Sequence, residues 1–286
     1  MRHDFTVGAS ANRATTFLDN DQLRSLAPSI FAEDPHESRS DRYQYIPTIG
    51  IVEEMRAEGF FPVKVTCARV RAVADQTREG FQKHMIRFRR SEQGLAVGDV
   101  FPEVVLVNSH DGSSAYNLMA GLHRLVCSNG LVVCDSELSA TRVTHKGHDV
   151  IEDVIEGSYR VLSQSNLALE KSQEWGLIEL NPMEQQALAI SAHHVRFADS
   201  EGVVATPIKV EQLLLPRRNE DRKNDLWTIF NRIQENAVKG GLSAYGAGSN
   251  GRRRRTTSKE VKGIDGNVSL NKALWLLADC LASARK

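Results

Sequence analysis

The sequence lacks the features that mark several common classes of protein. Its cysteines, Cys67, Cys127, Cys134 and Cys280, form no CxxC pair and have no regular spacing, so neither a disulfide framework nor a zinc site is indicated. No window approaches the roughly eighteen apolar residues of a membrane span, and the first residues contain no apolar signal core. We therefore expect idle thiols in a reducing compartment, no membrane segment and a cytoplasmic protein.

Net charge is lacking too, because 36 Lys and Arg residues balance 36 Asp and Glu residues. The overall charge therefore favours no partner, but its distribution does. Residues 134–184 contain ten acids and four bases, whereas residues 216–262 contain twelve bases and five acids. A protein with separate acidic and basic regions can bind a polyanion locally without general stickiness.

Motifs for nucleotide binding or catalysis are also absent. The chain contains no Walker loop, GxGxxG turn, HExxH or GxSxG, and nothing in it predicts a cofactor. Asp149, Glu152, Asp153 and Glu156 share one predicted helix. Helical acid runs are usually solvent-exposed faces, and no lysine follows in the manner of a metal-dependent nuclease. These absences favour a protein that is not an enzyme.

What the chain does contain is a run of four arginines beside a Gly/Ser-rich stretch, namely Arg252, Arg253, Arg254 and Arg255. Adjacent guanidinium groups repel one another and cannot be buried together, so such a run persists most readily when a polyanion neutralises it. Arginine also offers phosphate a bidentate set of donors. Lys259 and Lys262 extend the patch. We therefore expect the basic loop 243–263 to contact nucleic acid.

A second basic element is predicted in the strand that spans residues 83–90. Lys83, Arg87 and Arg89 fall within a segment that contains no acid. One face of an antiparallel sheet is commonly exposed to water, and a basic face of that kind can also follow a phosphate backbone. Tyr43 and Tyr45 lie near basic residues, where they could either stack on bases or pack in the core.

The pattern of apolar residues predicts an α+β fold. A helix is expected over 48–58, followed by strands over 60–71, 83–90 and 103–108 in meander order, which implies an antiparallel sheet of three or more strands. Ser113 or Ser114 could cap a further helix that ends at Asn129-Gly130. We expect an arm and a short helix over 1–32, an α+β core over 33–145 and a mainly helical region over 146–286.

The turn 108–112 is a second candidate for function, because it follows a buried strand directly. Asn108, His110 and His123 are its candidate residues. His110, His123 and Cys127 could be metal ligands, but no fourth ligand is evident, and an isolated histidine is more often simply hydrogen-bonded. The turn could instead offer backbone N–H groups to a phosphate at the start of the predicted helix.

Four stretches of the chain resemble one family of bacterial proteins. They are residues 36–48 (HESRSDRYQYIPT), 106–112 (LVNSHDG), 127–131 (CSNGL) and 226–236 (LWTIFNRIQEN). They look like the YfjQ/YafZ-like family, which is found on prophages, plasmids and other mobile elements. The match covers nearly the whole chain and its motifs are specific, but it transfers no catalytic residue.

A second resemblance is architectural and weaker. The expected order over residues 43–130, a helix, three strands and a helix, is similar to the core of single-strand annealing proteins. Those proteins assemble into rings or filaments, and they hold single-stranded DNA in a basic groove without hydrolysing nucleotide. This is an analogy of fold alone.

We therefore predict a non-enzymatic nucleic-acid-binding protein of a mobile element that binds or anneals single-stranded DNA, with a homo-oligomer as one possibility. Two alternatives stay open. One is an enzyme or anti-defence factor that acts through the turn 108–112 with His123. The other is an interaction protein whose acidic middle, residues 134–184, mimics nucleic acid.

Overall fold

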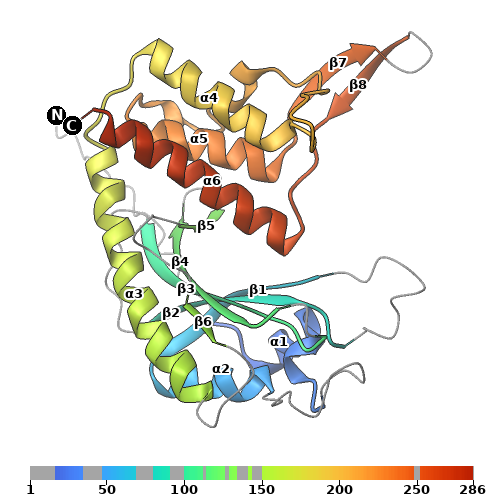
Figure 1. Ribbon diagram of the computed structural model, residues 1–286, viewed down its shortest axis with the longest axis vertical. Helices are drawn as coiled ribbons and strands as arrows, with labels where there is room; N and C mark the ends of the chain where they lie inside the picture. Colours follow the sequence, from blue (N-terminus) through green and yellow to red (C-terminus); the bar gives the residue numbers. More distant parts are fainter. Residues whose placement is uncertain are drawn as a thin grey trace, which may run out of the picture.

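A computed structural model describes nine ranges of the chain: residues 17–34, 47–68, 80–90, 100–111, 114–125, 129–133, 141–143, 150–247 and 252–285. Within them lie an N-terminal half built on a sheet and a C-terminal half built mostly of helices (Figure 1). The α+β fold predicted from the sequence is confirmed. Tyr43 and Tyr45 lie outside the described residues.

In the described part of the chain, six antiparallel strands form the sheet of the N-terminal half. Strands β1 to β5 follow one another in order, and β6 pairs with β4 on the same edge as β5. The strands are β1 (Phe60–Cys67), β2 (His84–Arg90), β3 (Val100–Asn108), β4 (Tyr116–Arg124), β5 (Asn129–Val132) and β6 (Thr141–Val143). The meander predicted for the first three strands is confirmed.

One face of this sheet is covered by helices. Its side chains alternate along the strands with those of the other face, as the pleat requires, and they include Ile86, Phe88, Val104, Leu106, Leu118 and Leu122. Helix α2 (Thr48–Ala57) packs on β1, and α3 (Val150–Trp175) packs on β3 and β4. Gly157 lets α3 approach β4 closely, because a Cβ there would lie 2.7 Å from Leu118 Cδ1. α1 (Asn20–Leu26) and the 3-10 helix η1 (Pro28–Phe31) complete this layer.

The second face of the sheet is only partly covered. Met85, Val105, Val107, Met119 and Val132 form a smaller apolar cluster with Ile264 and Val268. Those two residues belong to the first turns of α6 (Ile264–Ser283). An ion pair of 2.9 Å between Lys83 Nζ and Asp265 Oδ2 also ties β2 to this helix. The helical half therefore rests on one part of the second face, and the rest of that face contains charged side chains.

The predicted helix between Ser113 and Gly130 was wrong, because the structure places β4 there. Leu118 and Leu122 fit helical spacing, but they also alternate with Asn117, Met119 and His123 on opposite faces of a strand. Residues 117–124 pair with β3, and this pairing favours a strand over a helix. The order helix, three strands, helix is therefore not present, and the likeness to annealing proteins loses its basis.

The helical half is built from α4 (Pro182–Phe197), α5 (Leu226–Lys239) and α6. Both α4 and α5 begin at a side-chain cap: Asn181 and Glu184 form a capping box at α4, and the Asp225 side chain accepts from Thr228 N–H at α5. Two further helical segments are short. Residues 206–215 form only the 3-10 helix η3 (Val210–Leu214), and residues 19–32 divide into α1 and η1 at Ala27. A further 3-10 helix, η4 (Asn219–Arg222), precedes α5.

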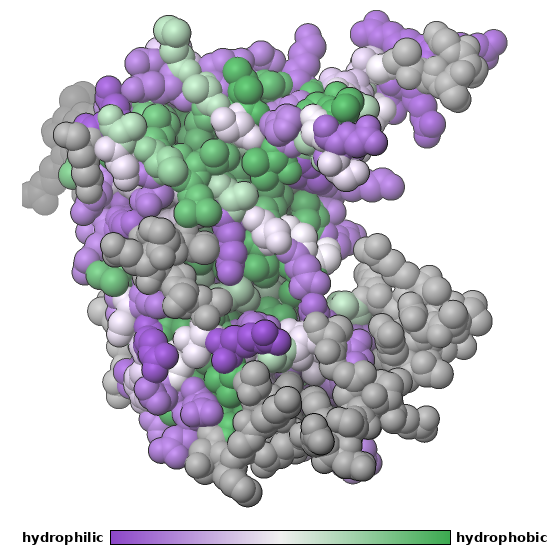
Figure 2. Space-filling view, in the orientation of Figure 1, coloured by the Kyte–Doolittle hydropathy of each residue, from purple (hydrophilic) through white to green (hydrophobic). Residues whose placement is uncertain are grey.

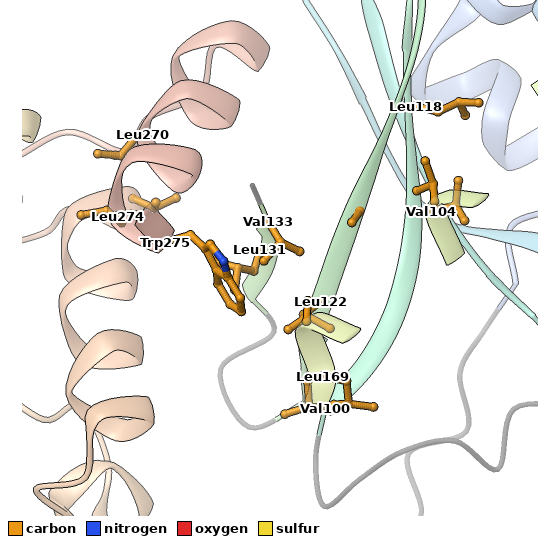
Figure 3. Close-up of a cluster of buried hydrophobic side chains, with 14 of the residues drawn as sticks. Val100, Val104, Leu118, Leu122, Leu131, Val133, Leu169, Leu270, Leu274 and Trp275 are labelled. Atoms are coloured by element: carbon orange, nitrogen blue, oxygen red, sulfur yellow. The ribbon is translucent and has the colours of Figure 1, made fainter. Parts of the chain in front are cut away.

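Helix α3 connects the two halves (Figure 1). At 26 residues it is about 39 Å long, and it packs on the sheet and on α5. A second junction lies at β5, where Trp275 of α6 points toward Leu131 and Val133 (Figure 3). One hydrophobic cluster extends from Leu23 to Ala282 through both halves. None of the described helices combines the length and the apolar character that a membrane span needs.

Candidate nucleic-acid interface

The arginine run forms one strand of an exposed β-hairpin, not a loop. Strand β7 (Ser243–Ala247) pairs with β8 (Arg253–Thr257) in antiparallel register. The hairpin projects from the helical half (Figure 1), and hydrophilic side chains cover it (Figure 2). All five residues of β8 are exposed. The prediction that these arginines cannot be buried is confirmed for Arg253, Arg254 and Arg255.

The two faces of the hairpin carry different groups. Tyr245 lies directly across from Arg255, and Arg253 Cζ lies 4.6 Å from the centroid of the Tyr245 ring, in a cation–π contact. Tyr245 is nonetheless 59% exposed. Arg254 points to the opposite face, because side chains alternate along a strand. One face therefore offers an aromatic ring between two guanidinium groups, and the other offers a further cation.

The base of the hairpin is held firmly by the helical half. Gly240 ends α5 with a φ of +65°, and a Cβ there would lie 2.6 Å from Ser258 O, so the chain turns sharply into β7. Gln212 Nε2 donates to Ser243 O at 3.0 Å. Arg196 Nη2 donates to Lys259 O at 2.8 Å. The hairpin is therefore a braced projection, not a free tether.

Much of the remaining positive charge of residues 216–262 is neutralised internally. Arg218 pairs with Asp221 at 2.9 Å and with Glu235 at 2.8 Å, and Lys239 pairs with Glu235 at 3.0 Å. Among the described residues, no carboxylate pairs with the side chains of Arg253, Arg254 and Arg255. The hairpin is therefore the place where three adjacent guanidinium groups of this basic region are exposed to solvent.

The two lysines after the hairpin are also accessible. Lys259 and Lys262 are exposed in the segment between β8 and α6. Lys262 Nζ lies 3.8 Å from Glu260 Oε2, and an exposed pair at that distance is worth little. The predicted patch from Arg252 to Lys262 is thus exposed at all six of its cations, on both faces of the hairpin and in the segment that follows it.

Strand β2 does not belong to this surface, and the prediction that Arg87 and Arg89 lie on a wet face was wrong. Arg87 is 2% exposed and Arg89 is 6% exposed. Both bond to Glu103 on β3, with 2.7 Å between Arg89 Nε and Glu103 Oε1. Burial alone would raise the pKa of the Glu103 carboxyl, but the two arginines outweigh it and hold that pKa below its usual range.

Arg87 reaches across the sheet to β4 and β5. Its Nη2 donates to Leu122 O at 3.2 Å and to Leu131 O at 2.9 Å. Two glycines make room for the guanidinium group: a Cβ at Gly121 would lie 2.9 Å from Arg87 Nη2, and one at Gly130 would lie 2.6 Å from Arg87 Cζ. The Gly130 of the CSNGL stretch therefore has a structural reason.

The candidate residues of the turn 108–112 do not meet His123. His110 and Asn108 are fully buried, where His110 Nε2 lies 2.9 Å and Asn108 Nδ2 3.0 Å from Thr48 Oγ1. His84 Nε2 lies 3.0 Å from the same hydroxyl. The shared hydroxyl ties the start of α2 to the ends of β2 and β3. Burial lowers the pKa of His84 to about 4, so the His84 ring is neutral at pH 7.

His123 lies at the other end of β4, beside the buried ion pairs. Its Nδ1 is 4.0 Å from Glu103 Oε1. Burial lowers the pKa of His123 to about 4, against the pull of Glu103 and with the help of the nearby arginines. Seven strand positions separate the β3 partners of His84 and His123, which is more than 20 Å at about 3.4 Å per residue. The catalytic constellation considered from the sequence is therefore not assembled.

No group of three His, Cys, Asp or Glu side chains in the described ranges could hold a metal ion. The acids Glu152, Asp153 and Glu156 are exposed on α3, as expected of a solvent-facing helix surface. Two residues of interest were not recognised in the sequence. Tyr245 could have been found in the sequence, because it is the one aromatic residue of the Gly/Ser-rich stretch. Glu103 could not, because its partners depend on strand register.

Comparison with known proteins places the chain in a family. The family described as "Domain of unknown function (DUF932)" matches residues 35–275. The UPF0380 protein YfjQ and the UPF0380 protein YafZ, both of Escherichia coli (strain K12), are each 46% identical to this chain over 264 residues, which is 92% of this chain and 91% of each relative. No solved structure matches. The chain belongs to the DUF932 family, with the UPF0380 proteins YfjQ and YafZ among its relatives.

Proposed function

We propose that this protein binds nucleic acid through the β7–β8 hairpin and the lysines that follow it, and that single-stranded DNA of a mobile element is its natural partner. The observation that carries the proposal is the exposed, braced strand β8 with its unneutralised arginines. A flexible polyanion with a charge at every nucleotide satisfies such a row of guanidinium groups, and each neutralised phosphate releases a counterion.

Tyr245 favours a single strand over a duplex. An exposed aromatic ring between arginines offers a stacking surface to an unpaired base, whereas the bases of a duplex are already stacked on one another. A two-stranded ribbon is also of a size that the major groove of DNA admits, so duplex DNA is the comparison that the experiment must include.

The proposal concerns binding and not annealing. The argument for annealing was the element order of residues 43–130, and β4 replaces the second helix of that order. The enzyme alternative loses the convergence of the turn 108–112 with His123, as described above. The acidic mimic stays an alternative, because Glu152, Asp153 and Glu156 are exposed on α3.

A fluorescence-polarisation titration with labelled single-stranded and duplex oligonucleotides tests the proposal. Replacing Arg252, Arg253, Arg254 and Arg255 by Gln should weaken single-strand binding about 100-fold near 0.1 M salt. It should also lower the slope of log K against log salt by up to about 2.8, because each single-strand phosphate contact contributes about 0.7. Tyr245→Ala should cost about 1–3 kcal/mol with single strands and little with duplex.

A matched control separates the hairpin from net charge. Arg24, Arg142, Arg160 and Arg222 are exposed and scattered over other elements, so replacing these four by Gln changes the net charge by the same amount. The control variant should bind almost as the wild type does. Equal loss in both variants, or no salt-dependent binding by the wild type, would remove the proposed function.

A further inference from the structure

Among the described residues of the second face of the sheet, Lys64 is a cation that forms no ion pair with a carboxylate. Lys64 of β1 lies directly across from Arg87 of β2, next to a bulge between Pro62 and Lys64. Like charges in directly opposed positions destabilise a sheet. Glu103, the acid of this face, is bonded to Arg87 and Arg89. No Asp or Glu of the described residues forms an ion pair with Lys64.

Lys64 is surrounded by protein and yet reachable by solvent. Its side chain is exposed, but its pKa is lowered, first by desolvation and then by Arg87. Figure 2 shows a hollow in the surface beneath the hairpin, along the edge of the helical half. The packing of Ile264 on the second face and the ion pair between Lys83 and Asp265 bring the segment after the hairpin close to this part of the sheet.

Groups from the helical half face the same position. Lys239, at the end of α5, lowers the pKa of Lys64, and Glu260, between β8 and α6, opposes that effect in part. Lys239 is itself bonded to Glu235. Glu103 also raises the pKa of Lys64, but desolvation, Arg87 and Lys239 together hold that pKa below its usual value. An anion that entered the hollow would relieve this repulsion.

The hollow adjoins the base of the hairpin. Strand β8 ends at Thr257, and Glu260 follows three residues later, which is at most about 10 Å of extended chain. Lys259 and Lys262 flank Glu260 in sequence and are exposed. Exposed cations thus continue from β8 into the segment that contains Glu260, and Glu260 is near enough to Lys64 to raise its pKa.

We propose that Lys64 is a second phosphate contact, which binds a backbone phosphate of the strand held by the hairpin where that strand enters the hollow between the sheet and the helical half. The inference rests on the proposed function and adds the path of the bound strand. It makes the sheet part of the interface, through a residue about 190 positions before the arginine run.

The test compares Lys64→Gln with Lys223→Gln in the full-length protein. Lys223 is exposed just before α5, at the opposite end of that helix from the hairpin, so its loss removes the same charge elsewhere. Titration with a labelled thymidine oligonucleotide should show Lys64→Gln about 3- to 10-fold weaker, with a salt slope lower by about 0.7. Lys223→Gln should bind as the wild type does.

Thermal unfolding provides the second readout. Because Lys64→Gln removes a like-charge pair, its Tm should equal or exceed that of the wild type, so weaker binding would not be a folding defect. Inorganic pyrophosphate is the remaining arm. Suppose that pyrophosphate raises the Tm of the wild type but not of Lys64→Gln, while the two proteins bind oligonucleotide equally well. The hollow would then bind free phosphate, and the proposed path of the strand would be wrong.

The possible failures are distinguishable. If the hairpin variant loses binding while Lys64→Gln matches Lys223→Gln, the inference is overturned and the proposed function stands. If neither the hairpin variant nor Lys64→Gln changes binding, both fail together. A Lys64→Gln protein with a clearly lower Tm would assign Lys64 a structural role and would also overturn the inference.

Discussion

Two strands of this protein are equally rich in arginine and have opposite environments. Strand β2 buries Arg87 and Arg89, whereas β8 exposes Arg253, Arg254 and Arg255. The difference comes from their neighbours. Next to β2 lie the Glu103 carboxylate and the space that two glycines leave, but the partner of β8 is a single short strand without an acid. Counting cations along a strand therefore does not locate a binding surface; the groups on the adjacent strands do.

The largest expected effect on the contrast between β2 and β8 is a loss of stability in Glu103→Gln. The change leaves two buried arginines without their carboxylate, so we expect the free energy of unfolding to fall by about 3–5 kcal/mol. Urea denaturation followed by circular dichroism measures it. Glu260→Gln, which removes an exposed carboxylate on the hairpin side, should change stability by less than about 0.5 kcal/mol. Similar small losses in both variants would contradict the structural role assigned to Glu103.

A lower pH should also reduce the stability of the buried region around β2 and leave binding by the hairpin unchanged. His123 has a pKa of about 4 in the folded protein and about 6.5 when unfolded. Between these values the unfolded chain binds the extra proton, so the stability that the neutral ring contributes is present above pH 6.5 and is lost as the pH falls toward 4. The loss is at most about 3 kcal/mol.

Unfolding free energies measured from pH 7 to pH 4.5 check this expectation. His84 shares the same direction, so His123→Asn should flatten the pH dependence in part and not abolish it. An unchanged slope in this variant would show that His123 does not titrate as stated. Residues 243–257 contain no histidine and no carboxylate, so oligonucleotide affinity above the unfolding pH should not follow the stability loss.

The smallest effects are expected from two glycines. Gly130→Ala would put a Cβ 2.6 Å from Arg87 Cζ, and we expect a loss of about 1–3 kcal/mol as Arg87 is displaced. At Gly50, a half-buried position of α2, an added Cβ would meet nothing within 4 Å, so Gly50→Ala should stabilise by about 0.5–1 kcal/mol. Thermal denaturation of both variants measures the contrast, and stabilisation by Gly130→Ala would show that Arg87 does not need that space.

The sequence predicted the parts of the fold that local signals determine. The helix over 48–58 and the first three strands are confirmed, because the periodicity of apolar residues acts within a few positions. The segment 113–129 was misassigned because its leucines fit both periods, and only pairing with β3 distinguishes them. The environment of Arg87 could not be foreseen, since it depends on which residues four neighbouring strands place beside it.

For the candidate site, the sequence predicted the exposure of the hairpin arginines, but it did not predict that the cations of β2 are bonded within the protein. Clustered arginines in a Gly/Ser-rich stretch predict exposure without any knowledge of the fold. Whether Lys83, Arg87 and Arg89 join them depends on ion pairs with residues up to 182 positions away, such as that between Lys83 and Asp265. Such pairs leave no signal in a single sequence.

Helix α3 has a consequence for how this chain can change during evolution. Because the same helix covers the sheet and supports α5, and because Trp275 rests on β5, neither half can be exchanged by recombination without remaking the core of the other. The hairpin touches the core only at its base and can diverge freely. We therefore expect members of the family to differ most in the length and charge of the hairpin, and to differ less in the core that the two halves share.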